Sequence, residues 1–166
     1  MKRIEMAANL AIVVAALVVA GVLVKRHFLA PPTHGPAAAS ELEAGDRISL
    51  PGVDWTARKQ TLVMVLSSRC GLCEQGGPFY QRLASAAATR GVQVVAVFPP
   101  SESNSEDFLA RLAVPVSRVL QADLRAMKVA GTPTLVLVNR TGVVDRVWYG
   151  KLPSKREGEV LSALSS

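Results

Sequence analysis

Cysteine and histidine are scarce in this chain of 166 residues, and their scarcity limits the metal sites and the acid–base catalysis that it can support. The two histidines, His27 and His34, both precede residue 45, so the remainder of the chain has no histidine to act as a general base or a metal ligand. The two cysteines, Cys70 and Cys73, supply half of the four ligands that a structural zinc site needs. We therefore expect no bound metal.

Clusters of like charge are also missing. The net charge is +6, and half of it comes from Lys2, Arg3, Lys25 and Arg26 set against Glu5, all beside one apolar segment. In the rest of the chain, basic and acidic residues alternate along the sequence. Nucleic-acid-binding proteins gather Lys and Arg on one face or stripe, so this pattern argues against a nucleic-acid partner.

One long apolar run, residues 7–24, contains no charge. As a helix its eighteen residues would span about 27 Å, close to the hydrocarbon thickness of a bilayer, about 30 Å. We interpret residues 1–28 as a membrane anchor with one transmembrane helix in the cell membrane. A cleaved signal peptide is the alternative, because residues 18–20 fit a small-residue cleavage site. The apolar run continues beyond that site, which favours a retained anchor.

A linker and one domain are expected after the anchor. Proline and alanine are frequent in residues 29–44, which is typical of a semi-extended linker. Residues 45–166 have the length of a single domain with its own hydrophobic core. Strand-like and helical stretches alternate there and end in a hairpin and a helix, which predicts an α/β sandwich with a mixed sheet.

Cys70 and Cys73 stand between a buried strand at 62–66 and a helical pattern from 71 to about 89. A helix N-terminus favours negative charge, so Cys70 should ionise readily and attack disulfides as a thiolate. Cys73 follows one helical turn later, within reach of a mixed disulfide formed at Cys70. A structural disulfide closing so short a loop would stabilise the fold little, so redox chemistry is the preferred interpretation.

Other elements are predicted from local patterns around this site. They are an edge hairpin over 47–55, a strand over 92–98, a helix after a capping box at 103–106, a strand over 116–120, a helix over 122–129, a hairpin over 134–149 and a final helix from 154.

The order strand, Cys-Gly-Leu-Cys, helix resembles the thioredoxin fold, as do Pro78 and the later Thr132-Pro133. From about Gly45 onward the chain is most similar to membrane-anchored thiol–disulfide oxidoreductases of the TlpA/ResA type. The resemblance implies a thioredoxin-like sandwich with a central mixed sheet and an extra βα insertion. It also implies that Pro133 is cis and that the Thr132 backbone pairs with an extended client peptide.

The function implied by the resemblance is disulfide exchange with cysteines of exported or periplasmic proteins. The redox domain would face the periplasm or another extracytoplasmic space, a membrane or periplasmic electron-transfer partner would reset it, and no cofactor is needed. Arg69 stands where thioredoxins usually have tryptophan. It either lowers the pKa of Cys70 and steers acidic clients, or is a solvated surface arginine.

Two other functions stay open. A peroxiredoxin-like thiol peroxidase is suggested by Ser67, a hydroxyl residue three positions before Cys70. A non-catalytic thioredoxin-like assembly factor for a membrane-associated enzyme is the other alternative. The resembled families place an acid near the resolving thiol, at positions that here hold Met64 and Gly76. We therefore expect Cys73 to lack a carboxylate proton acceptor.

Overall fold

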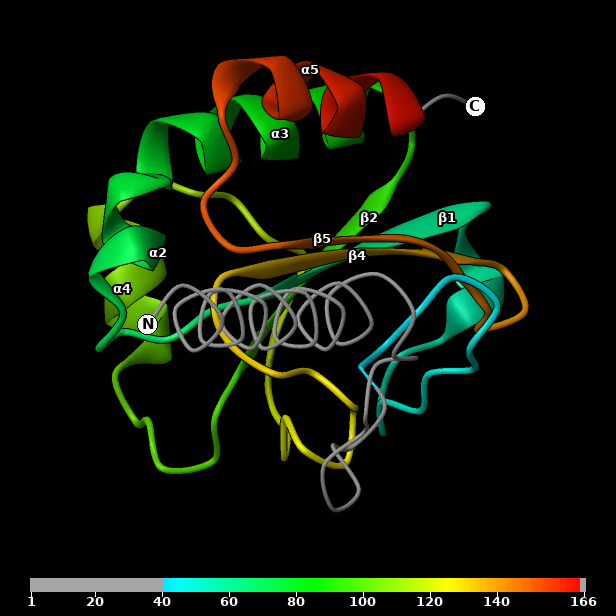
Figure 1. The fold of residues 1–166 in the computed structure, drawn as a ribbon, viewed down its shortest axis with the longest axis horizontal. Coiled ribbons are helices and arrows are strands. Elements are labelled where there is room, and N and C mark those ends of the chain that lie inside the picture. The colour runs from blue at the N-terminus through cyan, green and yellow to red at the C-terminus, as the bar shows by residue number, and fades with distance from the viewer. Residues whose placement is uncertain (1–40, 165–166) are drawn as a thin grey trace, which may run out of the picture. The chain divides into compact units, whose positions relative to one another are not determined.

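A five-stranded mixed sheet forms the centre of the computed structural model, which describes residues 41–164 (Figure 1). Its strand order is β3-β2-β1-β4-β5, with β1, β2 and β3 parallel to one another and β4 antiparallel to both β1 and β5. This is the predicted α/β architecture with a central mixed sheet. The strands are β1 (Gln60–Val65), β2 (Gln93–Phe98), β3 (Arg118–Gln121), β4 (Thr134–Asn139) and β5 (Val144–Tyr149).

The predicted membrane anchor, residues 1–28, lies outside the described residues, as does the predicted linker up to residue 40. Among the helices of residues 41–164, none has the length and apolar character needed to cross a bilayer.

The central strand β1 is buried on both faces. Leu62 and Met64 belong to one hydrophobic cluster, and Val63 and Val65 belong to a second cluster on the opposite face. A strand covered on both sides is apolar at successive positions, which is why its sequence shows a continuous apolar run. The carboxyl end of this strand leads directly to the two cysteines.

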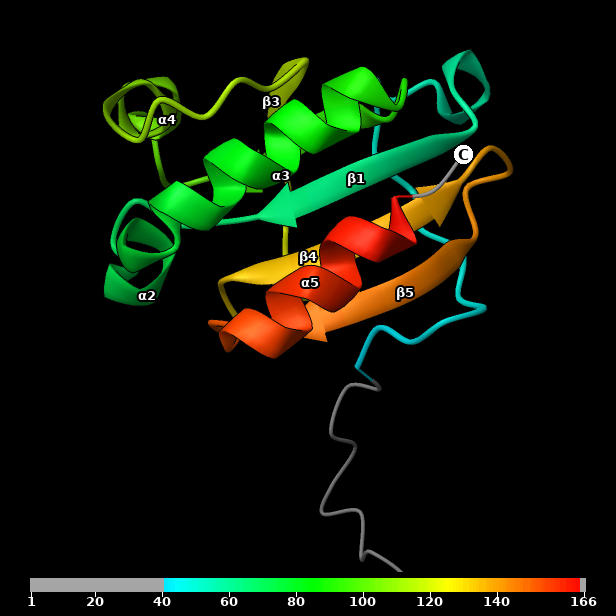
Figure 2. The same cartoon turned by 90° about the horizontal axis from the view of Figure 1, so that it is seen from above.

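Helices cover one face of the sheet, as Figure 2 shows. Helix α3 (Gly77–Thr89) lies on the side of β1 and β2, and α5 (Ser154–Ala163) lies over β4 and β5. The shorter helices α2 (Gly71–Gln75) and α4 (Ser105–Arg111) lie at one end of the molecule. Irregular segments carrying Leu42, Ile48, Leu50, Met127 and Val129 cover the other face.

The predicted edge hairpin over 47–55 is wrong. Arg47 forms only an isolated antiparallel bridge with Val143, and Trp55–Ala57 forms a short 3-10 helix, η2. The Asp54 side chain caps η2 by accepting a backbone N–H bond of 2.9 Å. Such local side-chain bonds compete with strand pairing, which explains the difference.

The helix predicted over 122–129 is also wrong, because successive turns take its place. The Asp123 side chain accepts the backbone N–H of Arg125 at 2.9 Å, and Lys128 has a φ of 58°, in the left-handed region. Both features interrupt an α-helix. The preceding strand β3 and the hairpin of β4 and β5 are confirmed.

The single helix predicted from 71 to about 89 is two helices, α2 and α3, with Gly76 between them. Pro78 is the second residue of α3, where a missing N–H breaks no helical hydrogen bond. It therefore begins a helix and does not bend one. The predicted capping box does not form, because α4 begins at Ser105 without a side-chain cap. The Asn104 side chain instead accepts a hydrogen bond from the Ser68 hydroxyl.

Candidate active site

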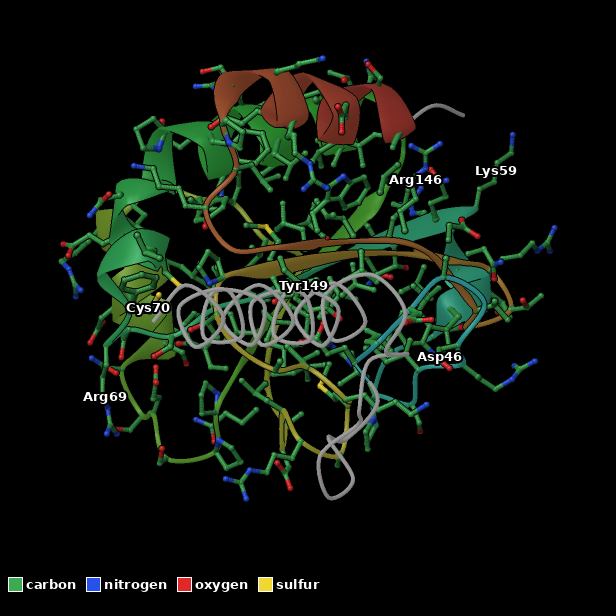
Figure 3. All side chains as sticks on the ribbon, in the orientation of Figure 1. Asp46, Lys59, Arg69, Cys70, Arg146 and Tyr149 are labelled. Carbon is green, nitrogen blue, oxygen red and sulfur yellow. The ribbon has the colours of Figure 1, made fainter. Side chains whose placement is uncertain are left out.

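Cys70 and Cys73 lie where β1 gives way to α2, at the end of the molecule labelled with Arg69 in Figure 3. Cys70 is the N-cap residue of α2 and is half-buried, whereas Cys73 is completely buried one turn later. Both are free thiols. The carboxyl end of a buried strand thus presents one accessible sulfur and covers the other.

Four of the predicted site residues come together. The Cys70 sulfur accepts the backbone N–H of Cys73 at 3.2 Å, and its thiol donates to the carbonyl of Thr132 at 3.3 Å. The peptide bond between Thr132 and Pro133 is cis, as predicted. The role of this segment in binding a client peptide stays a prediction.

The two thiols differ in acidity. Partial burial acts to raise the pKa of Cys70, but hydrogen bonds from the Cys73 thiol, the Thr132 side chain and nearby backbone N–H groups outweigh it and lower the pKa. Burial and the hydrogen bond to Cys70 raise the pKa of Cys73 to about 12. Because α2 has only five residues, direct hydrogen bonds replace the long helix dipole that the sequence suggested. Cys70 is the thiol that ionises more easily.

Arg69 is exposed and does not belong to the groups that lower the pKa of Cys70. Its guanidinium donates to the carbonyl of Ser101 at 3.3 Å, and its charge helps to lower the pKa of Glu102. The structure therefore directs this cation toward the loop after β2. Its role in steering clients stays a prediction.

Glu102, a carboxylate that the sequence reasoning missed, lies buried beside the site with 4% of its surface exposed. Its Oε1 accepts the Ser67 hydroxyl at 2.6 Å, and its Oε2 accepts the N–H and hydroxyl of Ser68 at 2.6 and 2.8 Å. Burial acts to raise its pKa, but these bonds and the Arg69 charge lower it, so the carboxylate is ionised at neutral pH. The available signal was an acid in the loop after β2, four residues beyond Phe98, because parallel strands bring their carboxyl ends to one edge.

Tyr80 fills the space beside Gly76, the position at which the resemblance implied an acid. A β-carbon at position 76 would lie 2.4 Å from both Cζ and Oη of Tyr80. Tyr80 itself is buried, with 3% of its surface exposed. Met64 is completely buried and supplies no acid. Met64 and Gly76 carry no carboxylate, and a phenol lies where the second acid of the resembled families would be.

Comparison with known proteins identifies the family. The Redoxin family matches residues 32–164. The chain belongs to this family. None of the curated proteins matches the chain significantly.

Solved structures similar to this Redoxin chain are thiol–disulfide proteins. A putative thiol:disulfide interchange protein DsbE from Chlorobium tepidum is 27% identical, with a TM-score of 0.58, over 76% of this chain and 100% of that one. A thiol-disulfide isomerase from Corynebacterium glutamicum is 19% identical, with a TM-score of 0.57, over 79% and 97%. StoA from Bacillus subtilis is 24% identical, with a TM-score of 0.51, over 75% and 98%. The last two show the fold alone.

The family, the similarity to the DsbE structure and the two free thiols agree. This Redoxin chain is a thiol–disulfide oxidoreductase with a thioredoxin-like fold. The resemblance to the TlpA/ResA type is thereby confirmed in family and fold.

Proposed function

We propose that the chain exchanges disulfides with cysteines of exported proteins through Cys70 and Cys73. The observation that carries this proposal is the contrast between the two thiols: Cys70 is half-exposed with a lowered pKa, and Cys73 is buried with a raised one. An attacking thiol must be accessible and ionised, whereas a resolving thiol must wait until the mixed disulfide exists.

In the reducing direction the reaction has two steps. The Cys70 thiolate attacks one sulfur of a client disulfide, so a mixed disulfide forms and one client sulfur leaves as a thiolate. Cys73 then loses its proton and attacks Cys70, which closes the Cys70–Cys73 disulfide and releases the second client sulfur. The client gains two electrons, and an electron-transfer partner at the membrane or in the periplasm supplies two others that reduce the Cys70–Cys73 disulfide again.

The surface around Cys70 suits an extended client. Leu72, between the cysteines, is an exposed apolar side chain, with 47% of its surface accessible. The Thr132 carbonyl lies within hydrogen-bond distance of Cys70, so a peptide attached to this sulfur would lie beside the Thr132 backbone. The apolar run at 7–24 supports tethering of this site to the membrane. The resemblance to anchored oxidoreductases supports a redox domain on the extracytoplasmic side.

The peroxidase alternative is less well supported. It requires a Ser67 hydroxyl that faces Cys70, but this hydroxyl donates to the buried Glu102 carboxylate at 2.6 Å. The same oxygen also accepts the backbone N–H of Arg69 at 3.2 Å. Its hydrogen-bonding capacity is thus directed to the loop and away from a peroxide at Cys70.

The test uses the full-length reduced chain in detergent micelles and a disulfide-bonded model peptide, followed by mass spectrometry. We expect the wild type to reduce the peptide and to become the Cys70–Cys73 disulfide. Cys73→Ser should stop at a mixed disulfide on Cys70, and Cys70→Ser should form none. Faster oxidation by hydrogen peroxide than by the peptide would favour a peroxidase. Full assembly activity of a Cys70→Ser, Cys73→Ser variant in cells would favour the assembly factor.

A further inference from the structure

The resolving step of the proposed function needs a route for one proton. Cys73 is completely buried, and its raised pKa of about 12 leaves it protonated at neutral pH. It must lose that proton when it attacks the mixed disulfide. Among residues 41–164 the buried carboxylate is Glu102, and both of its oxygens already accept hydrogen bonds from Ser67 and Ser68. The proton therefore needs another group.

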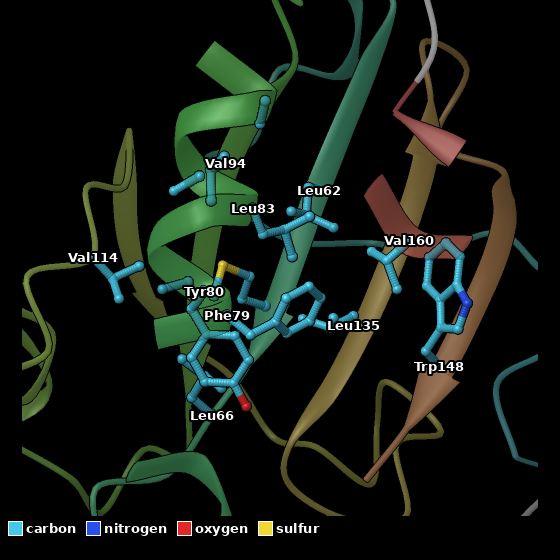
Figure 4. Close-up of a cluster of buried hydrophobic side chains, with 14 of the residues drawn as sticks. Leu62, Leu66, Phe79, Tyr80, Leu83, Val94, Val114, Leu135, Trp148 and Val160 are labelled. Atoms are coloured by element: carbon cyan, nitrogen blue, oxygen red, sulfur yellow. The ribbon is translucent and has the colours of Figure 1, made fainter. Parts of the chain in front are cut away.

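The position of the Tyr80 hydroxyl suits it to accept the proton of Cys73. The N–H of Gly76 bonds to the carbonyls of Leu72 and Cys73 at 3.1 and 3.2 Å, so positions 73 and 76 are helical neighbours with β-carbons about 5–6 Å apart. The Tyr80 oxygen lies 2.4 Å from the site of a β-carbon at Gly76. The phenol thus stands one helical turn from Cys73, and both residues belong to one buried cluster. Figure 4 shows Tyr80 in this cluster.

A small cavity of about 20 Å³ adjoins the phenol, and Gly76, Tyr80 and Glu157 are among the residues that line it. This volume holds about one water molecule. Glu157 comes from α5, and its side chain is 22% exposed and paired with Arg82 at 2.6 Å. The cavity is therefore lined by both the phenol and a carboxylate that is partly exposed to solvent.

The electrostatic surroundings keep the phenol neutral. Burial raises the pKa of Tyr80 above its usual value of 10, and the negative charges that Cys73, Cys70 and Glu157 carry when ionised raise it further. A phenol that keeps its proton is able to accept one proton and donate another at the same time. The titratable and charged groups around the phenol and its cavity are Cys70, Cys73, Glu157, Arg82 and Lys151.

We propose that Tyr80 relays the proton of Cys73 toward the cavity beside Glu157 during resolution of the mixed disulfide. This inference rests on the proposed function. As the Cys73 sulfur bonds to the Cys70 sulfur, the Cys73 proton passes to the Tyr80 oxygen, and the phenol proton passes to water in the cavity. The bond between Cys70 and the client breaks, and the client thiolate takes a proton from solvent. Tyr80 is neutral before and after, and no electron passes through it.

The test follows the two steps separately, in stopped flow, with the full-length reduced chain in detergent and 5,5′-dithiobis(2-nitrobenzoate). The first coloured thiolate is released when Cys70 attacks, and the second when Cys73 resolves the adduct. Tyr80→Phe should slow the second phase about tenfold near pH 7 and leave the first unchanged. The difference should shrink toward pH 10, because hydroxide then removes the proton. Tyr149→Phe is the matched control, since it removes the other tyrosine hydroxyl, which bonds to the Leu42 carbonyl at 2.6 Å.

A rescue variant keeps the test decisive if Tyr80→Phe folds poorly. The double variant Tyr80→Leu/Gly76→Glu removes the phenol and places a carboxylate in its space. Its second phase should be faster than that of Tyr80→Leu alone and should approach the wild-type rate. An unchanged second phase in folded Tyr80→Phe, or equal slowing of both phases, would overturn the relay. If the wild type itself releases neither thiolate, the proposed function fails and not merely the relay.

Discussion

The hydroxyl of Ser67 donates a hydrogen bond of 2.6 Å to Oε1 of Glu102, a residue 35 positions away in the sequence. Ser67 follows β1 and Glu102 follows β2, and these parallel neighbours bring their carboxyl ends to one edge of the sheet. Burial raises the pKa of Cys73, and the backbone N–H of Ser67 acts against this rise through a hydrogen bond. Glu102 therefore holds the loop that contacts the resolving thiol.

Glu102→Gln should destabilise the fold. The variant places an amide N–H₂ opposite a hydroxyl or N–H donor of Ser67 or Ser68, so one buried donor loses its acceptor. We expect the free energy of unfolding at pH 7, measured in urea, to fall by about 1–3 kcal/mol. Glu106→Gln removes an exposed carboxylate from α4 and is the matched control, with an expected change within about 0.5 kcal/mol.

The effect of Glu102→Gln should depend on pH with a definite sign. Because the folded pKa of Glu102 lies below its ordinary value of 4.5, its ionised form stabilises the fold above that pH. This contribution is lost as the pH falls through the lowered folded value. The difference between wild type and variant should therefore be constant near neutrality and shrink below about pH 4.5. A difference of the same size down to pH 3 would show that the charge is not responsible.

Limited alkylation should distinguish the two cysteines. Cys70 is accessible and has a lowered pKa, whereas Cys73 is buried with a pKa of about 12. Iodoacetamide reacts with the thiolate, so the reduced chain at pH 7 should be labelled at Cys70 first by at least tenfold. Peptide mapping by mass spectrometry measures both sites in one sample. Earlier labelling of Cys73 would reverse the roles proposed for the pair.

Arg69→Ala separates two effects of one charge. The guanidinium contacts the carbonyl of Ser101 and not the thiol, so the pH midpoint of Cys70 alkylation should stay unchanged. Attack on an acidic disulfide peptide should become slower and less dependent on salt, because the steering charge is gone. Arg111→Ala, which removes a cation stacked on Phe108 in α4, is the control. A raised midpoint for Cys70 in Arg69→Ala would show that this cation acts on the thiol.

The sheet and the dithiol were predictable because local patterns encode them. The run of apolar residues at 62–66 indicates a strand buried on both faces, and the structure confirms β1 there. Three positions separate Cys70 from Cys73, so a helix that begins at Cys70 places the two residues one turn apart. The cis peptide bond before Pro133 is also confirmed, and the family resemblance supplied that prediction.

Contacts between distant residues were not predictable. Nothing near Glu102 in the sequence shows that its carboxylate will accept hydrogen bonds from the two serines that follow β1. Tyr80 is buried in α3, and nothing near it in the sequence shows that its hydroxyl reaches over Gly76. The turns that replace the helix at 122–129 likewise depend on one side-chain bond and one left-handed residue.

A glutamate at position 76 would place a carboxylate where the resembled families carry an acid near the resolving thiol. The structure shows no room for this side chain while Tyr80 is present, so Gly76→Glu in the wild-type background should destabilise the fold. The β-carbon itself would lie 2.4 Å from the ring of Tyr80, which is buried and packed against Phe79 with ring centres 5.9 Å apart.

Gly76→Ala isolates this conflict, because it adds the β-carbon without a charge. Overpacking of this kind costs about 1–3 kcal/mol, so urea denaturation should show a loss of that order. Gly158→Ala in α5 is the matched control, since its β-carbon would meet nothing within 4 Å and alanine favours a helix by up to about 1 kcal/mol. If Gly76→Ala were as stable as this control, Tyr80 would be free to move away from Gly76. The phenol would then have no fixed position beside Cys73, and the relay would lose its geometric basis.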